Sequence, residues 1–209
     1  MTAHPAKFSK SILQVLHGIT HDCRLLLDPF AGTGLIHQME CPTVGIEIEP
    51  EWATLHPGTI IGNALTLPFR GRAFDCVATS CTYGNRMADH HHARDNSKRN
   101  TYRHTLGREL HPQNSGKLQW GTAYREFHLA AWNEVKRVLE PGGRFILNVS
   151  NHIRKGQEVD VAGWHRRTIQ MLGLWMEASH LVATRRQRQG ANGNARVPYE
   201  VIYIFRKAL

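Results

Sequence analysis

Residues 25–34 combine an acid with glycines in an order that suits ligand binding. An apolar run ends in Asp28, and two small-residue turns follow it, Ala31-Gly32 and Thr33-Gly34. Glycine lets the backbone approach a ligand that a Cβ would repel, and the first N–H groups of a following helix can hydrogen-bond that ligand. The pattern therefore predicts a buried strand that delivers a ligand-binding loop.

An acid also ends the next predicted strand. Residues 42–46 are followed by Glu47, thirteen residues after Gly34. An acid at the tip of the second strand of an α/β sheet is placed to hold ribose hydroxyls. Position 37 is His where the third glycine of a Gly-x-Gly-x-x-Gly fingerprint would fall, which disfavours pyrophosphate binding. The alternative is a tight strand–helix turn with a helix-capping acid.

This stretch resembles the cofactor loop of S-adenosylmethionine-dependent methyltransferases, in which Asp-Pro-Phe-Ala-Gly-x-Gly is typical of enzymes that act on nucleic acid bases. The resemblance implies an α/β fold of the class I, Rossmann-like type, with a seven-stranded doubly wound sheet and a C-terminal antiparallel hairpin. It also implies Glu47 on the ribose, Ile48 on one adenine face and Asp28 near the methionine end.

Two further segments are similar to the cofactor site of this family. A His-Pro-Ala-x-Phe segment at residues 4–8 is similar to the second cofactor-contacting motif of amino-group DNA methyltransferases. Asn63 stands where many relatives carry Asp, and its side-chain oxygen keeps the capacity to accept from the adenine amino group. The cofactor-binding residues that the resemblance implies are Lys7, Phe8, Ser9, Asp28, Phe30, Ala31, Gly32, Thr33, Gly34, Glu47, Ile48, Asn63, Ala64 and Ser80.

Residues 80–83 follow a strand predicted at residues 74–79, where reacting groups lie in a doubly wound sheet. An exocyclic base amine is a poor nucleophile because its lone pair is delocalised into the ring. The Ser80 hydroxyl and the Cys81 carbonyl can draw such an amine toward tetrahedral geometry, and the Tyr83 ring can stack on a flipped-out base. We therefore predict that Ser80, Cys81, Thr82 and Tyr83 form the catalytic loop.

The catalytic loop departs from the family pattern, which reads Ser/Asp/Asn-Pro-Pro-Tyr. Here Cys81 and Thr82 replace both prolines, which relaxes the fixed φ angles without removing either acceptor. Serine in the first position resembles the cytosine N4 enzymes more than the adenine N6 enzymes. Cys81 raises another alternative, a thiolate that attacks C6 of a pyrimidine so that C5 is methylated.

The net charge of +9 is concentrated in two segments, residues 84–122 with +4 and residues 184–209 with +5. The basic residues of the first segment are interleaved with Tyr102 and Trp120, which favours a polyanionic partner, most simply duplex DNA with a flipped target base. The alternative is a solvated loop and a basic terminus. His90, His91 and His92 are interpreted as a polar loop, and no metal site is predicted. The predicted DNA-binding residues are Asn85, Arg86, Arg94, Lys98, Arg99, Arg103, Arg108, Lys117, Trp120, Arg185, Arg186, Arg188 and Arg196.

One methyltransferase domain over residues 1–209 is expected, since 209 residues with 41% hydrophobic content can bury one sizeable core. Helical spacing predicts helices around residues 12–16, 124–138 and 164–172. Apolar runs predict strand five at residues 144–149 and a terminal hairpin from residues 174–184 and 198–205. Cys23 and Cys76 are expected in core strands. No apolar run approaches the roughly 18 residues of a membrane span, so we expect a soluble, cytoplasmic protein of a bacterial or phage-infected cell.

These features together predict a DNA methyltransferase that modifies an exocyclic base amine, preferably cytosine N4. Residues 83–91, 114–116 and 119–121 look like segments of small DNA methyltransferases from bacteriophages and actinobacterial prophages, which implies DNA methylation of the phage or restriction-modification kind. The open alternatives are adenine N6 methylation, an RNA or small-molecule methyltransferase, and a catalytically silent DNA- or cofactor-binding protein.

Overall fold

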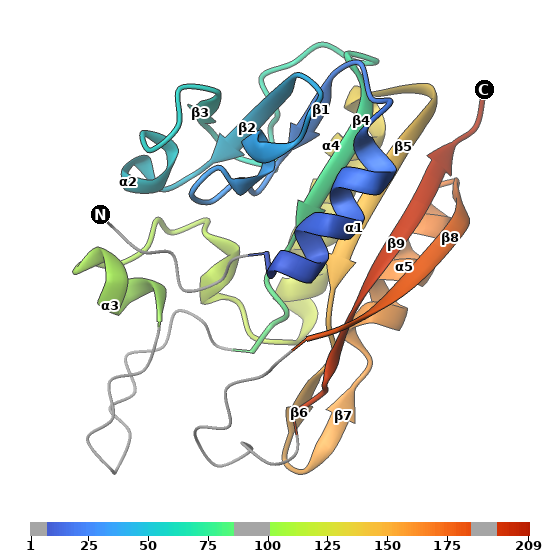
Figure 1. The fold of residues 1–209 in the computed structure, drawn as a ribbon. Helices are drawn as coiled ribbons and strands as arrows, with labels where there is room; N and C mark the ends of the chain where they lie inside the picture. Colours follow the sequence, from blue (N-terminus) through green and yellow to red (C-terminus); the bar gives the residue numbers. More distant parts are fainter. Residues whose placement is uncertain (1–7, 86–100, 185–195) are drawn as a thin grey trace.

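A seven-stranded sheet forms the centre of the molecule (Figure 1). The computed structural model describes residues 8–85, 101–184 and 196–209. The strand order is β3-β2-β1-β4-β5-β9-β8. The strands are β1 (Leu26–Asp28), β2 (Thr43–Glu47), β3 (Thr59–Ile61), β4 (Phe74–Ser80), β5 (Leu139–Val149), β8 (Leu174–Ala183) and β9 (Tyr199–Lys207).

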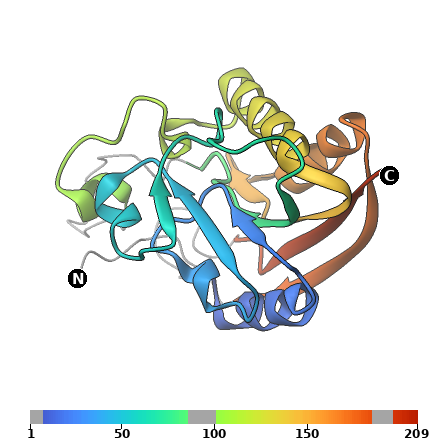
Figure 2. The ribbon, with the colours of Figure 1, turned by 90° about the horizontal axis from the view of Figure 1, so that it is seen from above.

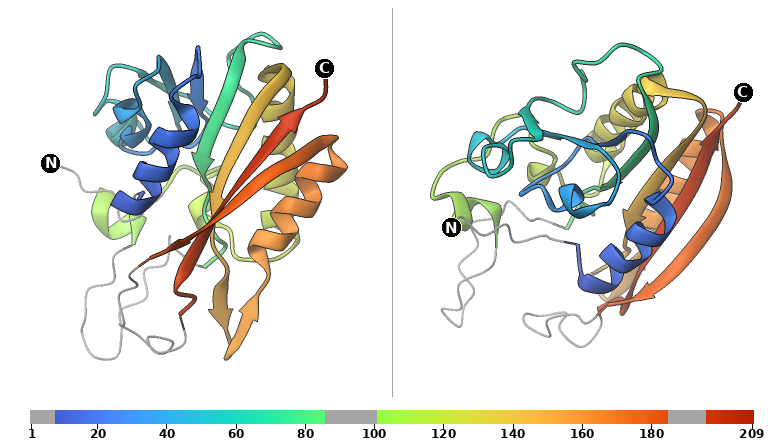
Figure 3. Two further views of the ribbon diagram at one scale, coloured as in Figure 1. Left: turned by 45° about the vertical axis from the view of Figure 1, so that its right-hand side comes forward. Right: turned by 45° about the horizontal axis from the view of Figure 1, so that its top comes forward.

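The predicted sheet topology is confirmed. Strands β1 to β5 pair in parallel, whereas β9 is antiparallel to both β5 and β8. Strand β9 therefore inserts between β5 and the edge strand β8, which lies at the outer margin of the sheet in both views of Figure 3. Because parallel strands end at one edge, the residues that follow β1, β2, β4 and β5 share the carboxyl edge of the sheet.

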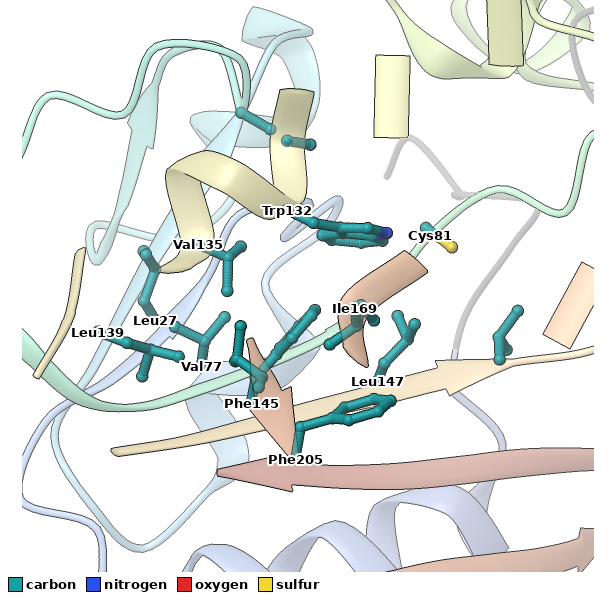
Figure 4. Close-up of a cluster of buried hydrophobic side chains, with 14 of the residues drawn as sticks. Leu27, Val77, Cys81, Trp132, Val135, Leu139, Phe145, Leu147, Ile169 and Phe205 are labelled. Carbon is teal, nitrogen blue, oxygen red and sulfur yellow. The ribbon is translucent and has the colours of Figure 1, made fainter. Parts of the chain in front are cut away.

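Helices cover both faces of the sheet (Figure 2). Helix α1 (Lys10–Thr20) lies on one face, and α4 (Thr122–Val138) and α5 (Val161–Met171) lie on the other. Each helix buries an apolar stripe against alternate strand residues, as the helical spacing predicted. Figure 4 shows the larger core, where Trp132 of α4 packs on Phe145 of β5 at a ring-centroid distance of 5.1 Å.

The remaining elements are short and mostly follow the carboxyl ends of strands. They are the 3₁₀ turn η1 (Leu35–Gln38), α2 (Pro50–Ala53), α3 (Tyr102–Leu106), the 3₁₀ turn η2 (Ser115–Lys117), and the two-stranded ribbon β6 (His152–Arg154) and β7 (Gln157–Val159). The sequence analysis did not predict the ribbon. Within the described ranges, every helix is too short or too polar to span a membrane.

The expectation of a helix after the glycine loop is wrong, because only the four-residue turn η1 follows Gly34. The His37 ring occupies that space and bonds Thr43 Oγ1 at 2.7 Å and Thr59 Oγ1 at 2.8 Å. The ring also stacks on His56, with a distance of 3.8 Å between the ring centroids. These side-chain bonds hold the chain against the first residues of β2 and β3, so a longer helix does not form.

Three smaller expectations also need correction. Cys23 is buried but precedes β1 instead of lying in a strand. Strand β5 begins at Leu139, since that residue pairs with Phe74 before a register shift, so β5 includes the segment that was expected to precede it. Helix α5 begins at Val161 because the Asp160 side chain accepts a bond from Gly163 N and caps it.

Candidate active site

The glycine loop lies at the carboxyl end of β1, as predicted. Gly32 and Gly34 have φ angles of +52° and +78°, in the left-handed region that favours glycine. Ala31 N donates to Ile46 O of β2 at 2.9 Å, and Gly34 N donates to Ala31 O at 2.8 Å. The loop is therefore folded back onto the tips of β1 and β2.

Glu47 at the end of β2 supports this loop. Its side chain is buried, and Oε2 accepts from Gly32 N at 2.9 Å while Oε1 accepts from Glu49 N at 2.9 Å. Burial raises the pKa of Glu47 to about 7. A carboxylate has about four acceptor positions, so Glu47 retains acceptor capacity for a ligand hydroxyl.

Asp28 ends β1 and is almost fully buried. Its Oδ1 accepts from Thr79 Oγ1 at 2.6 Å and from Phe30 N at 2.9 Å, and these contacts tie the tip of β1 to β4. Burial raises the pKa of Asp28 to about 7. Its second oxygen has no partner among the described residues, so it can accept a bond from a ligand.

A cavity of about 700 Å³ opens beside the tips of β2 and β3. Ile48 and Asn63, both predicted as adenine contacts, line it. Residues 108–113 line it as well, so a segment distant in sequence contributes to the wall. The volume is within the range of roughly 300–1,000 Å³ that is common for small-molecule sites.

Glu49 attaches this distant segment to the sheet. Its side chain has 0% exposure, and Oε1 accepts from His111 N at 2.8 Å and from Asn114 Nδ2 at 2.7 Å. Oε2 accepts from Arg108 Nη2 at 2.8 Å. Trp52 and Tyr102 add an edge-to-face contact beneath the same segment. The basic segment of residues 84–122 is an insertion between β4 and α4, and the part of it that the structure describes is thus packed onto the core.

The catalytic loop begins at the tip of β4, as predicted. Asn148 of β5 donates through Nδ2 to Ser80 Oγ at 3.3 Å and to Glu200 Oε2 at 2.7 Å. The Tyr83 hydroxyl lies 3.3 Å from Ser80 Oγ and donates to Glu200 Oε2 at 3.1 Å. Because the Tyr83 proton points to Glu200, Ser80 must donate its own proton to the Tyr83 oxygen.

A second buried network fixes the middle of the catalytic loop. Trp132 Nε1 donates to His165 Nδ1 at 3.0 Å, so a neutral His165 carries its proton on Nε2. That nitrogen lies 2.8 Å from the Tyr124 hydroxyl, which donates to Thr82 O at 2.5 Å. Burial lowers the pKa of His165 well below its ordinary value, which keeps the ring neutral.

This network argues against Cys81 as a nucleophile. The thiol is buried, and its Sγ lies 3.6 Å from His165 Nε2, the nitrogen that already holds a proton. His165 therefore cannot accept the thiol proton. Burial also raises the pKa of Cys81 to about 12, so the thiolate needed for attack on a pyrimidine does not form at neutral pH.

Several predicted DNA contacts have structural partners in the described part of the chain. Arg108 pairs with Glu49 and Glu51, and Arg103 pairs with Glu109. Trp120 is half-buried and packs on Tyr124 and Trp164. Among the other predicted contacts, Asn85, Lys117 and Arg196 are exposed.

The rest of the predicted set divides between the amino-terminal segment and ranges outside the described residues. Phe8 packs against the core cluster that contains Ile12 and Leu16, and Ser9 caps α1 by accepting from Ile12 N at 3.3 Å. Ala64 is buried in the other core cluster. Lys7, Arg86, Arg94, Lys98, Arg99, Arg185, Arg186 and Arg188, like residues 90–92, lie outside the described ranges.

Sequence reasoning missed four residues that build the site: Glu49, Asn148, His165 and Glu200. Their only sequence signal is a polar side chain inside or directly after an apolar strand or helix pattern. Such a signal does not identify the partner, because these contacts join positions far apart in the sequence, such as Asn148 and Glu200 or Glu49 and Asn114.

No family model and no curated protein matches this sequence. Solved structures do match over nearly the whole chain. A methyltransferase from Methanosarcina mazei described as S-adenosylmethionine-dependent is 13% identical, with 98% of this chain and 100% of that chain covered and a TM-score of 0.60. The 1,6-didemethyltoxoflavin-N1-methyltransferase of Burkholderia thailandensis, solved with S-adenosylhomocysteine, is 15% identical, with 94% and 76% covered and a TM-score of 0.51.

A third similar structure, the [4+2]-cyclase SpnF, is 13% identical, with 99% of this chain and 84% of that chain covered and a TM-score of 0.61. A cyclase and methyltransferases thus share this architecture, so the reaction must be argued from the site. The similarity and the sheet order agree on one conclusion. The chain has the fold of class I S-adenosylmethionine-dependent methyltransferases.

Proposed function

We propose that this protein is an S-adenosylmethionine-dependent methyltransferase that modifies an exocyclic amine of a nucleic acid base, with cytosine N4 as the first candidate. One observation carries the proposal. The glycine loop after β1, Glu47 at the end of β2 and Ser80 at the end of β4 share the carboxyl edge of a sheet with methyltransferase topology.

The residues at this edge fit the cofactor. Glu47 retains acceptor capacity for a ribose hydroxyl, and Asp28 keeps one oxygen for the amino group of the methionine part. The cavity beside Ile48 and Asn63 has apolar and polar walls suited to adenine. When bound, S-adenosylmethionine supplies an electrophilic methyl group on its sulfonium centre.

Ser80 is the acceptor that orients the target amine. Its proton is donated to Tyr83 and one lone pair accepts from Asn148 Nδ2, so its second lone pair stays available for an incoming N–H. The Cys81 carbonyl has no hydrogen-bond partner among the described residues and provides the second acceptor. The two bonds favour tetrahedral nitrogen, with its lone pair available for attack.

The same contacts provide a path for the proton that the methylated nitrogen must lose. The proton passes to Ser80 Oγ while Ser80 passes its own proton to the Tyr83 oxygen, and Tyr83 passes its proton to the Glu200 carboxylate. Each oxygen keeps its bond count, and the carboxylate becomes a carboxylic acid. Ser80, Tyr83 and Glu200 thus act as one proton relay.

A nucleic acid target is supported by the net charge of +9, concentrated in two segments. The ion pairs of Arg103 and Arg108 favour a second candidate, a small-molecule methyltransferase, because these two cations serve the internal structure. The Methanosarcina and Burkholderia structures are consistent with either candidate, since their likeness concerns the fold.

The test is mass spectrometry of nucleosides from DNA incubated with the protein and methyl-labelled S-adenosylmethionine. Labelled N4-methylcytosine is expected, and the Ser80→Ala variant should lose it while still binding S-adenosylhomocysteine. Labelled N6-methyladenine would change the target but keep the relay. Label in RNA alone, or in neither nucleic acid despite cofactor binding, would refute the DNA target.

A further inference from the structure

The cavity beside β2 and β3 has walls from two parts of the chain. One wall consists of residues at the tips of the two strands, including Ile48, Ile61 and Asn63. The facing wall is residues 108–113, which belong to the insertion and not to the sheet. A ligand in this cavity therefore contacts the insertion as well as the strand tips.

The insertion wall is held in place before any ligand binds. Glu49 accepts bonds from Arg108 Nη2, His111 N and Asn114 Nδ2 at 2.7–2.8 Å, on both sides of Gln113. Gln113 N also donates to His111 Nδ1 at 3.2 Å. The backbone that carries Gln113 is thus fixed relative to the tip of β2.

Hydrogen bonds also determine the orientation of two amides at the cavity. Leu65 N donates to Asn63 Oδ1 at 2.9 Å, which identifies the oxygen of that amide. Asn63 Nδ2 therefore points to Gln113, whose Oε1 accepts from it at 2.9 Å. The Gln113 Nε2 group and the second lone pair of its Oε1 have no partner within the described ranges.

An amide that presents one donor beside one acceptor matches the edge of adenine. The adenine amino group donates and a neighbouring ring nitrogen accepts, which is the pairing that Asn and Gln make with adenine. Ile48 and Ile61, which line the same cavity, offer apolar contacts for the faces of the ring. The Gln113 side chain is at the exposed rim of the cavity, where an entering ring would cover it.

We propose that Gln113 binds the cofactor by reading the amino edge of its adenine, with Asn63 fixing the orientation of the Gln113 amide. The proposal rests on S-adenosylmethionine being the cofactor. It places one residue of the insertion in the cofactor site, so adenine selectivity depends on a segment outside the sheet.

The test compares two ligands by isothermal titration calorimetry: S-adenosylhomocysteine and S-inosylhomocysteine, in which an oxygen replaces the adenine amino group. The wild-type protein should prefer S-adenosylhomocysteine. Gln113→Ala should weaken S-adenosylhomocysteine binding on the order of tenfold, since about one to two hydrogen bonds are lost. It should leave S-inosylhomocysteine binding nearly unchanged, so the preference disappears.

Two further variants sharpen the result. Gln113→Glu keeps acceptors for Asn63 and for the adenine amino group but removes the donor to the ring nitrogen. It should therefore weaken S-adenosylhomocysteine binding while keeping the preference for this ligand over S-inosylhomocysteine. Gln119→Ala removes an exposed glutamine of the same insertion that does not line the cavity, and it should bind like the wild type.

The outcomes distinguish the cofactor assignment from the role of Gln113. A wild-type protein that binds neither ligand would overturn the cofactor assignment, and with it this inference. A wild-type protein that binds S-adenosylhomocysteine while Gln113→Ala binds equally well would overturn only the role of Gln113. If Gln113→Ala weakened the binding of both ligands equally, the role of Gln113 would also be overturned, because Gln113 would then act through shape and not by recognising the amino group.

Discussion

Replacing Glu49 by Gln should release the insertion from the core. Glu49 Oε1 accepts from His111 N and Asn114 Nδ2, and Oε2 accepts from Arg108. The amide keeps one acceptor oxygen, so the first two bonds weaken from charge-assisted to neutral, by about 1 kcal/mol each. The Arg108 guanidinium then faces an NH₂ group, and because this side chain is 39% exposed its lost pair adds at most about 1 kcal/mol.

The sum is about 3 kcal/mol for local opening, which corresponds to exchange on the order of 100-fold faster for amides of the insertion. Native-state hydrogen exchange with mass spectrometry measures this on peptides that cover residues 101–121. Peptides from β4 and β5 should keep their protection, since their bonds do not involve Glu49.

Glu51→Gln is the matched control. Glu51 also pairs with Arg108, but its side chain is 40% exposed, so the pair contributes less than about 1 kcal/mol. The control should leave exchange in residues 101–121 nearly unchanged. Exchange at the wild-type rate in Glu49→Gln, or equal acceleration in both variants, would contradict this prediction, since burial of the carboxylate would then not be the deciding factor.

Four further predictions concern the candidate active site and its core. Cys81→Ala should retain methyl transfer, and native Cys81 should resist alkylation at pH 8 in mass-spectrometric mapping, because burial raises its pKa to about 12; loss of activity would restore the thiolate alternative. Glu200→Gln should lower kcat more than it raises KM, because the proton relay loses its terminal acceptor while Tyr83 keeps a hydrogen-bond partner; an unchanged kcat would refute the relay. The affinity for S-adenosylhomocysteine should fall as pH drops below about 7, where Glu47 and Asp28 take up protons and stop binding the ligand as carboxylates. Calorimetry across pH on wild type and Glu47→Gln checks this: the variant should show a weaker pH dependence, with the part from Asp28 remaining, and an unchanged dependence would contradict the role of Glu47. Burial lowers the pKa of His128 to about 4, so the unfolded chain binds one more proton than the folded chain between about pH 6.5 and pH 4, and the free energy of unfolding falls with decreasing pH. In urea unfolding over this pH range, the wild type should lose about 3 kcal/mol more of its free energy of unfolding than His128→Leu does. The same pH dependence in both proteins would contradict the assignment.

Local patterns in the sequence were sufficient for the scaffold. Apolar runs and the alternation of strand residues predicted β1, β2, β4 and the hairpin β8–β9, because burial on a sheet imposes a short period that neighbouring residues reveal. The glycine loop after Asp28 and the acid at Glu47 were also predicted from local patterns. Turn conformation and strand ends depend on residues close together in the chain.

The correction at η1 shows where local patterns fail. The residues after Gly34 contain nothing that forbids a helix, yet His37 bonds Thr43 and Thr59 and holds the chain in a short turn. The bond to Thr59 joins positions 22 residues apart, so local sequence preferences cannot predict it. Tertiary contacts outweighed the local preference.

The sequence by itself determined the fold class and the positions of the glycine loop, Glu47 and Ser80. Only the tertiary structure decided what their neighbours do: Arg108, predicted as a phosphate contact, pairs with the buried Glu49, and Glu200 closes a relay with Tyr83. Charge and polarity can be read from a sequence, but burial and pairing arise when distant segments meet. Whether a cation binds a nucleic acid or a buried carboxylate therefore depends on the folded arrangement.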